Sequence, residues 1–132
     1  MIALAQQKYQ DPRVVFKAED VLALPEDDFD LAIIYSAYPH FPDKPALVAQ
    51  TARLLKPGGR FLVAHSESRR TINARHHTLP NPNLSSTLQP ARQEASVWSS
   101  LFEIDLLGDN NDIYFFSGTK REHPIQEQHS FK

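Results

Sequence analysis

Polar side chains that could bind a small molecule, or remove a proton from it, gather in the middle of the chain. They are His65, Ser66, Arg69, Asn73 and either His76 or His77. A histidine can act as a general base near neutral pH, and guanidinium and amide groups bind anionic or polar substituents. The pattern predicts His65 as a catalytic base. Arg69, Asn73 and His76 are predicted to contact the substrate. Alternatively, a serine caps a helix here and the basic side chains face solvent.

A second histidine, His40, follows another apolar run and lies between Pro39 and Phe41. It could serve as a catalytic base, second to His65, or its ring could simply fill the loop between its two neighbours. Together with His65 and His76 it could also bind zinc or nickel, which suit neutral imidazole ligands. The spacing of the three histidines is not diagnostic of a metal site, so we predict none.

Both candidate bases follow apolar runs of strand length that flank a helix. The first run lies within residues 29–36 and the second within residues 60–66. Asp43 is a suitable N-cap for the helix, and Pro45 suits its first turn. Lys56 suits the last turn, and the residues Pro57-Gly58-Gly59 should end the helix. This order predicts a strand–helix–strand unit with parallel strands.

Parallel strands end at the same edge of a sheet, and ligands of open α/β sheets bind at that edge. Residues 35–40 and 65–69 should therefore lie together. An earlier β-branched run, residues 13–18, is predicted as a further strand. A parallel strand there would place Asp20 at the same edge as Ser36 and His65.

The rest of the chain supplies helices, a long loop and a hairpin. Residues 1–10 predict a short helix and residues 21–25 a single turn, and a further helix should start near Ser66 or Ser68. Residues 79–89 are predicted as a mobile loop that could act as a lid, followed by a helix over residues 91–101. Two strands, over residues 102–107 and 112–119, should form an antiparallel hairpin.

Composition narrows the class of protein. The 132 residues suffice for one domain, which we expect at residues 1–119, with a polar, flexible tail at residues 120–132. Fourteen basic and sixteen acidic side chains give a net charge of −2 without a basic stripe, which argues against nucleic acid as a partner. The chain has no cysteine and no apolar run near the ~20 residues that span a membrane. We therefore expect a cytoplasmic protein that does not bind a membrane.

An ordered set of motifs resembles the class I S-adenosylmethionine-dependent methyltransferases of the UbiE-like, type 11 group. The motifs are Asp20 with Leu24-Pro25, Phe29-Asp30-Leu31, Pro39-His40-Phe41 with Asp43, and Arg53-Leu54-Leu55-Lys56-Pro57-Gly58-Gly59. Their order is more specific than any one of them, and the resemblance covers roughly residues 1–120. It implies a truncated Rossmann-like α/β sheet, mostly parallel, with helices on both faces and a C-terminal antiparallel hairpin.

The resemblance also implies S-adenosyl-L-methionine as the cofactor and a small molecule as the methyl acceptor. Asp20 would accept a hydrogen bond from the adenine amino group, and the backbone N–H of Val21 would meet a ring nitrogen. Ser36 and Tyr38 would lie near the methionine part of the cofactor. His40 matches the family's usual histidine after the central strand.

The family also carries a strand, a Gly-rich loop and a second strand ahead of the point where this chain starts. The four glycines here are Gly58, Gly59, Gly108 and Gly118, so no G-x-G loop is present. The matching sheet lacks the strand that would lie between residues 13–18 and residues 30–35. We expect residues 30–35 to pair instead with residues 13–18, with a second copy of the chain in a homodimer, or with a partner chain.

Three functions follow from these observations. The first is a methyltransferase domain that is incomplete at its cofactor site, and it is our prediction. The alternatives are a non-catalytic scaffold or self-association module with the same core, and a fragment of a longer methyltransferase. A nicotinamide-binding domain fits less well, because its phosphate-binding loop is absent too.

Overall fold

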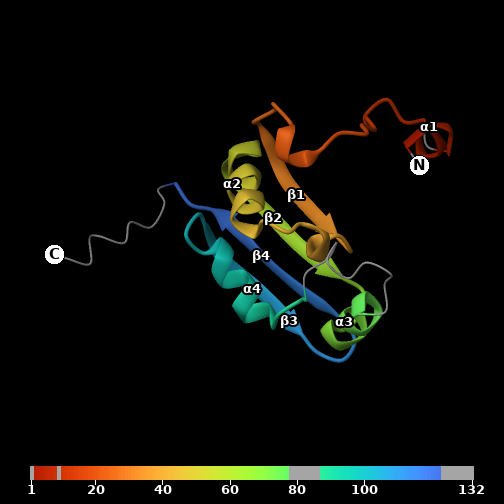
Figure 1. Cartoon of the computed structure of the whole chain (residues 1–132). Helices are drawn as coiled ribbons and strands as arrows, with labels where there is room; N and C mark the ends of the chain where they lie inside the picture. The colour runs from red at the N-terminus through yellow and green to blue at the C-terminus, as the bar shows by residue number, and fades with distance from the viewer. Residues whose placement is uncertain (1, 9, 78–86, 123–132) are drawn as a thin grey trace.

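A four-stranded sheet forms the centre of the molecule (Figure 1). The computed structural model describes residues 2–8, 10–77 and 87–122. The strands are β1 (Phe29–Tyr35), β2 (Leu55–His65), β3 (Phe102–Asp109) and β4 (Tyr114–Lys120), in the spatial order β1-β2-β4-β3. β1 and β2 are parallel, whereas β4 is antiparallel to both β2 and β3. The predicted α/β sheet and its closing hairpin are confirmed.

Helices connect the strands in the predicted places. They are α1 (Ile2–Lys8), α2 (Lys44–Leu54), α3 (Arg69–His77) and α4 (Ala91–Trp98), with short 3₁₀ turns η1 (Val21–Ala23) and η2 (Tyr38–His40). The last helix ends at Trp98 rather than at residue 101, where we expected its end. Within the described ranges, no helix is both long enough and apolar enough to cross a lipid bilayer.

The unit formed by β1, α2 and β2 is the predicted parallel crossover. Asp43 caps α2 by accepting a hydrogen bond from the backbone N–H of Ala46, at 3.0 Å. α2 ends at Leu54 and β2 begins at the next residue, so Gly58 lies inside the strand rather than in a turn before it. The ladder between the two strands shifts register after Phe29, and Gly58, at φ 80°, supplies the left-handed backbone in this irregular stretch.

The apolar core lies on the face of the sheet that α2 and α4 cover. At its centre the ring of Phe61 stacks on Trp98, with centroids 4.0 Å apart, and meets Phe102 and Phe116 edge to face. Large aromatic side chains bury most of the apolar area that stabilises such a small fold. This core fixes α4 on β2 and on the hairpin, and thereby the whole edge where the parallel strands end.

The other face of the sheet is open along β1. Leu31, Ile33 and Tyr35 point to this face, and they are 51%, 57% and 59% exposed. The described helices that pack on the sheet, α2 and α4, both lie on the opposite side, with the core. Our prediction of helices on both faces is therefore confirmed for one face only.

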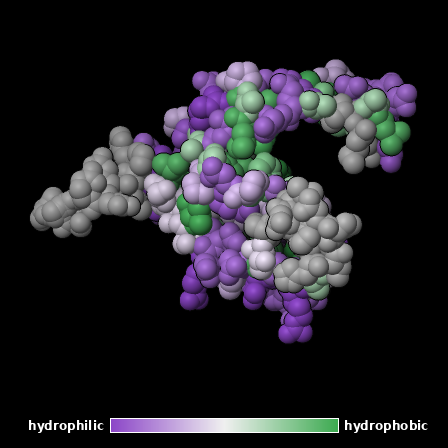
Figure 2. All heavy atoms as spheres, viewed as in Figure 1, coloured by the Kyte–Doolittle hydropathy of each residue, from purple (hydrophilic) through white to green (hydrophobic). Residues whose placement is uncertain are grey.

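Residues 13–18 are extended but form no strand, so the predicted strand there, and its pairing with β1, are wrong. Val15 is 74% exposed, and Lys17 Nζ forms an ion pair with Glu26 Oε2 at 2.6 Å. The backbone of the segment joins no ladder of the described sheet. A β-branched sequence becomes a strand only when a neighbouring strand exchanges hydrogen bonds with it, and no strand of the described sheet pairs with this segment. Figures 1 and 2 show this N-terminal segment and α1 reaching away from the sheet.

The predicted loop at residues 79–89 falls largely outside the described residues. Its end is described: Leu88 is buried, and its backbone N–H and C=O bond to the side-chain amide of Asn73 at 2.8 and 2.9 Å. Residues 123–132 of the expected tail also lie outside the described ranges, and Lys120 is the last residue of β4.

Candidate functional site

The ends of β1 and β2 lie side by side, as their parallel pairing requires. Tyr35 is opposite Ala64, and the backbone N–H of Ser36 donates to the Ala64 carbonyl at 2.9 Å. Ser36 has a φ of 55°, a left-handed conformation that costs a non-glycine residue about 1–2 kcal/mol. The chain therefore turns sharply at the end of β1 and leads at once into η2, and strain of this kind is typical of ligand sites.

Tyr38 anchors η2 in the core. Its side chain is fully buried, and its hydroxyl donates to Glu94 Oε1 at 3.1 Å and accepts from Trp98 Nε1 at 3.3 Å. Burial raises the pKa of the Tyr38 hydroxyl, the Trp98 N–H lowers it, and the Glu94 carboxylate raises it further. Glu94 Oε2 accepts a second bond, from the backbone N–H of Gln89 at 2.9 Å. Tyr38 thus fixes the loop after β1, and its hydroxyl is committed to the interior.

His65, the first candidate base, is the last residue of β2 and is 7% exposed. Its ring lies edge to face with that of Tyr114, its ladder partner on β4, with centroids 6.0 Å apart. The Tyr114 hydroxyl in turn donates to the Gln89 carbonyl at 2.8 Å. The structure places His65 at the predicted edge, but its side chain is buried against Tyr114 of the core.

His40, the second candidate base, ends η2 and is exposed. Its backbone N–H donates to the Ala37 carbonyl at 3.0 Å, which closes the turn. The two histidines therefore differ in their surroundings: His40, after β1, lies at the surface, whereas His65, at the end of β2, is buried. Among the described residues, no three side chains of the metal-binding types are grouped closely enough to hold a metal ion.

α3 carries the three predicted substrate contacts, and two of them bind other parts of the chain. The amide of Asn73 is occupied by the backbone of Leu88, as described above. Arg69 Nε lies 3.6 Å from Asp109 Oδ2, and the Arg69 side chain remains 39% exposed. His76 lies near the end of α3.

Val21 begins η1, which rests on α2, and Asp20 is the N-cap of that turn. Gln50 Nε2 donates to the carbonyls of Val21 and Leu24, both at 3.0 Å. Asp20 is exposed, and its Oδ1 accepts from the backbone N–H of Leu22 at 3.0 Å, so the carboxylate caps its own turn. The contacts with α2, rather than a strand at residues 13–18, decide where Asp20 lies.

A groove of about 540 Å³ between β1 and α2 links η1 to β1. Val21 lines it together with Phe29, the first residue of β1, and with Tyr35 and Ala37, at and beyond its end. The groove thus extends along the whole length of β1, and Asp20 directly precedes the residue of η1 that lines it. The strand at residues 13–18 that was expected to carry Asp20 to the edge of Ser36 and His65 is not part of the described sheet.

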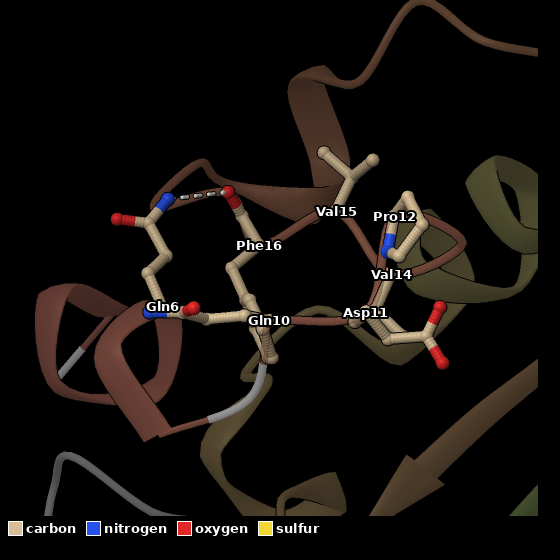
Figure 3. Close-up of a pocket in the computed structure, with 7 residues that line it drawn as sticks. All are labelled: Gln6, Gln10, Asp11, Pro12, Val14, Val15 and Phe16. Carbon is tan, nitrogen blue, oxygen red and sulfur yellow. Dashed lines mark hydrogen bonds between the residues drawn. The ribbon is translucent and has the colours of Figure 1, made fainter.

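A separate cavity of about 390 Å³ lies wholly within the N-terminal segment (Figure 3). The Gln6 amide donates to the Phe16 carbonyl at its mouth, at 3.5 Å. Asp11, the carboxylate that lines it, is paired with Arg13 at 2.7 Å. The cavity contains none of the predicted site residues.

The four glycines all lie in strands of the sheet. Their positions bear on whether the chain can bind S-adenosyl-L-methionine. Gly58 and Gly59 lie in β2, Gly108 in β3 and Gly118 in β4. A Cβ atom at Gly118 would lie 2.7 Å from the Glu103 carbonyl, so this glycine permits close strand packing. Close approach of backbone to a cofactor typically needs a glycine turn at the strand ends. Among the described residues, the glycines therefore form no such turn after β1 or β2.

Two side chains that organise this region escaped prediction, Glu94 and Asp109. Glu94 shares a buried helix face with Ala91, Ala95 and Trp98. A carboxylate on an otherwise apolar helix face is the sequence signal that could have identified it. Asp109 Oδ2 accepts from the backbone N–H of Ala91 at 2.9 Å and so caps α4 from the end of β3. Only the folded hairpin brings that cap into place.

Residues 1–63 match the model of a family described as a methyltransferase domain. The chain is 42% identical over 55 residues to the 27-O-demethylrifamycin SV methyltransferase of Amycolatopsis mediterranei, a stretch that covers 40% of this chain and 20% of that protein. It is 34% identical over 65 residues to the methyltransferase GfsG of Streptomyces halstedii, covering 48% and 23% of the two chains. The chain thus spans about a fifth of the length of these curated relatives.

Solved structures with the same fold cover more of the chain. A SAM-dependent methyltransferase from Methanosarcina mazei superposes with a TM-score of 0.64 at 19% identity, over 91% of this chain and 77% of that one. The protein bound to the Trm112 methyltransferase activator in Haloferax volcanii gives 0.72 at 17% identity, over 92% and 68%. The N-methyltransferase NodS of Bradyrhizobium japonicum, in complex with S-adenosyl-L-homocysteine, gives 0.64 at 16% identity, over 92% and 62%.

Proposed function

We propose that this chain, a relative of the class I S-adenosylmethionine-dependent methyltransferases by the match of residues 1–63 and by its fold, is part of a methyltransferase domain. The observation that carries the proposal is the β1–α2–β2 crossover with its left-handed turn at Ser36, because it lies largely within the matched residues. S-adenosyl-L-methionine would supply a methyl group on a sulfonium, which is already a good leaving group. The protein then has mainly to orient the acceptor and exclude water.

We propose that η1 and the loop after β1 hold the cofactor. Asp20 would accept a hydrogen bond from the adenine amino group, with the Val21 N–H directed at a ring nitrogen. Ser36, whose side chain is exposed at the turn, would lie near the methionine part. Tyr38 would act by positioning, because its buried hydroxyl holds η2 against Glu94.

We propose a small molecule as the methyl acceptor. The support is that one relative is named for methylating 27-O-demethylrifamycin SV, a small molecule. For an acceptor that must lose a proton, His65 is the first candidate base and His40 the second. Arg69, which is partly exposed, and His76 are the candidate acceptor contacts on α3, and Asn73 would support them by holding Leu88.

The test is a calorimetric titration of the purified chain with S-adenosyl-L-homocysteine. We expect micromolar binding that Asp20→Ala abolishes and that Asp28→Ala, the loss of another exposed carboxylate nearby, leaves intact. Binding that survives Asp20→Ala would disprove the role of Asp20 alone. A folded chain that fails to bind at millimolar ligand would overturn the assignment of this chain as a cofactor-binding domain.

A second function, a non-catalytic scaffold, is favoured by one observation. All the glycines lie in strands, and the side chains of β1 stand exposed on the open face. Such a scaffold would associate through β1 and would bind no cofactor. Association without binding of S-adenosyl-L-homocysteine would therefore favour the scaffold over the enzyme.

A further inference from the structure

A small polar cavity, here called the arginine pocket, lies between the start of α3 and the turn that joins β3 to β4. Its volume is about 180 Å³. Two short stretches line it, one at the start of α3 and one at the turn: Ser68, Arg69 and Arg70, and Asp109, Asn110 and Asn111. Figure 1 shows α3 beside this turn. The first stretch closely follows the end of β2, so the pocket lies at the edge of the sheet where the parallel strands end.

The lining of the pocket is positively charged, because it holds two guanidinium groups and one carboxylate. That carboxylate is already engaged: Asp109 Oδ2 accepts from the backbone N–H of the first residue of α4 at 2.9 Å and lies 3.6 Å from Arg69 Nε. Arg70 is exposed and forms no ion pair with any residue that the structure describes. Glu67, the acidic residue that precedes α3, is paired with Arg75. The pocket therefore favours an anionic ligand.

Arg69 is held by the fold with part of its side chain accessible. Its Nε is shielded from solvent and has no hydrogen-bond acceptor among the described residues. The side chain is nevertheless 39% exposed, so its exposed part consists of other atoms. Burial and the charges of Glu94 and Asp109 raise the pKa of the Tyr114 hydroxyl, and the nearby Arg69 guanidinium lowers it. A charged group that is partly removed from water in this way is stabilised by an anion.

The other polar groups of the lining also suit an anion. Asn110 Oδ1 accepts from the backbone N–H groups of Asp112 and Ile113, at 2.8 and 3.0 Å. The acceptor atom of this amide is thus used within the turn, and its NH₂ group can only donate. Across the pocket, α3 begins with two arginines and has no acidic residue in its first turn. Positive side chains are unfavourable at the positive end of a helix dipole, and a conflict of this kind is typical of functional sites.

We propose that the arginine pocket binds a carboxylate or phosphate group of the methyl acceptor, an inference that rests on the proposed function. The guanidinium groups of Arg69 and Arg70 would each donate to the anionic oxygens, since their forked geometry matches that of both anions. The NH₂ group of Asn110 would donate a further bond. The acceptor would then belong to a definite class, the small molecules that carry an acidic substituent.

The place of the pocket in the sheet favours the acceptor over the cofactor as its occupant. His65 and Asp109 are both opposite Tyr114, so β4 alone separates the ends of β2 and β3. Neighbouring strands lie about 4.8 Å apart, which puts the pocket about 10 Å from the end of β2 and about 14 Å from the end of β1. The carboxylate of a methionine part near Ser36 would not reach it. An acceptor would extend along the edge, from the pocket toward the loop after β1.

The probe is inorganic phosphate, titrated into the isotope-labelled chain at constant ionic strength and followed by backbone amide NMR signals. We expect saturating shifts at millimolar phosphate, confined to residues 68–70 and 109–111. Arg70→Gln, which alters an exposed side chain, should keep the fold and weaken binding about tenfold, the loss of a charge-assisted contact. The control Arg13→Gln removes an equal charge from the N-terminal segment and should bind phosphate as the unmodified chain does. Shifts that never saturate, or equal affinity for Arg70→Gln, would overturn the pocket.

A second titration, with S-adenosyl-L-homocysteine in the presence and absence of phosphate, separates the two sources of the anion. If the pocket serves the acceptor, both ligands should bind together without weakening each other. Competition between them would assign the pocket to the carboxylate of the cofactor and overturn the acceptor as its occupant. If phosphate binds and S-adenosyl-L-homocysteine does not, the proposed function fails, and the acceptor with it, while the anion pocket stands. The opposite result would overturn the pocket and leave the proposed function intact.

Discussion

The hydroxyl of Tyr38 donates to the carboxylate of Glu94, 3.1 Å away and 56 residues later in the chain, in a site that excludes water. This bond joins the loop after β1 to α4, and the second carboxylate oxygen joins α4 to Gln89. One buried carboxylate thus holds three segments around the end of the parallel strands. Its removal should be felt both in stability and in the shape of that edge.

We expect Glu94→Leu to lower the free energy of unfolding by about 2–3 kcal/mol. The variant leaves the Tyr38 hydroxyl and the Gln89 N–H without their acceptor inside the protein, and an unsatisfied buried group costs about 1–3 kcal/mol. Glu94→Gln, which keeps one acceptor oxygen, should lose less than half as much. Urea unfolding followed by circular dichroism measures both variants, with the exposed neighbour Gln93→Ala as the control. Equal losses for the two Glu94 variants would contradict this account.

Stability should fall at alkaline pH because of two buried tyrosines. Burial raises the pKa of Tyr38 and, aided by the charges of Glu94 and Asp109, that of Tyr114. Both phenols stay protonated in the folded chain above pH ~10, where they ionise in the unfolded chain. Their contribution is complete below that pH and is lost as the pH rises, by about 1.4 kcal/mol per pH unit for each tyrosine.

The measurement is urea unfolding at a series of pH values above 9, on the unmodified chain and on Tyr114→Phe. The phenylalanine cannot ionise, so the variant should lose stability with pH about half as steeply. Identical slopes would show that Tyr114 ionises as readily in the folded chain as in the unfolded one.

Gly118→Ala should destabilise the hairpin more than Gly58→Ala. A Cβ atom at Gly118 would lie 2.7 Å from the Glu103 carbonyl and 2.9 Å from the ring of Phe61, neither of which can move easily. Overpacking of this kind costs about 1–3 kcal/mol. At Gly58 nothing lies within 4 Å, so only the left-handed backbone, at φ 80°, opposes a side chain, at about 1 kcal/mol. Thermal unfolding compares the two, and the reverse order would disprove this packing argument.

The elements that local sequence determines were predictable. Asp43 and Pro45 mark the start of α2 because capping depends on neighbours within one turn. The hairpin of β3 and β4 was predictable because its strands alternate and a polar turn joins them. The crossover followed from two apolar runs around a helix. Each of these signals lies within a few residues of the element that it specifies.

What depended on distant partners was not predictable. Residues 13–18 have the composition of a strand, but none of the described strands pairs with them, and the Lys17 side chain forms an ion pair with Glu26. The turn that follows Asp20 is held by Gln50 of α2 instead of by a strand. Glu94 was missed because its structural role depends on the hydrogen bond from Tyr38, which is far away in the sequence. A residue pattern indicates which structures a segment can form, and the segments that pack against it decide which one it adopts.

The stacking of Trp98 on Phe61 makes the chain its own fluorescent probe. Trp98 is the sole tryptophan, and its indole N–H bonds to Tyr38 within the core. Its emission will therefore report whether α4 is seated on the sheet. It will be insensitive to the N-terminal segment, which lies away from the core (Figure 1). An unfolding curve read by fluorescence alone would overlook detachment of that segment, whereas circular dichroism would register the loss of α1.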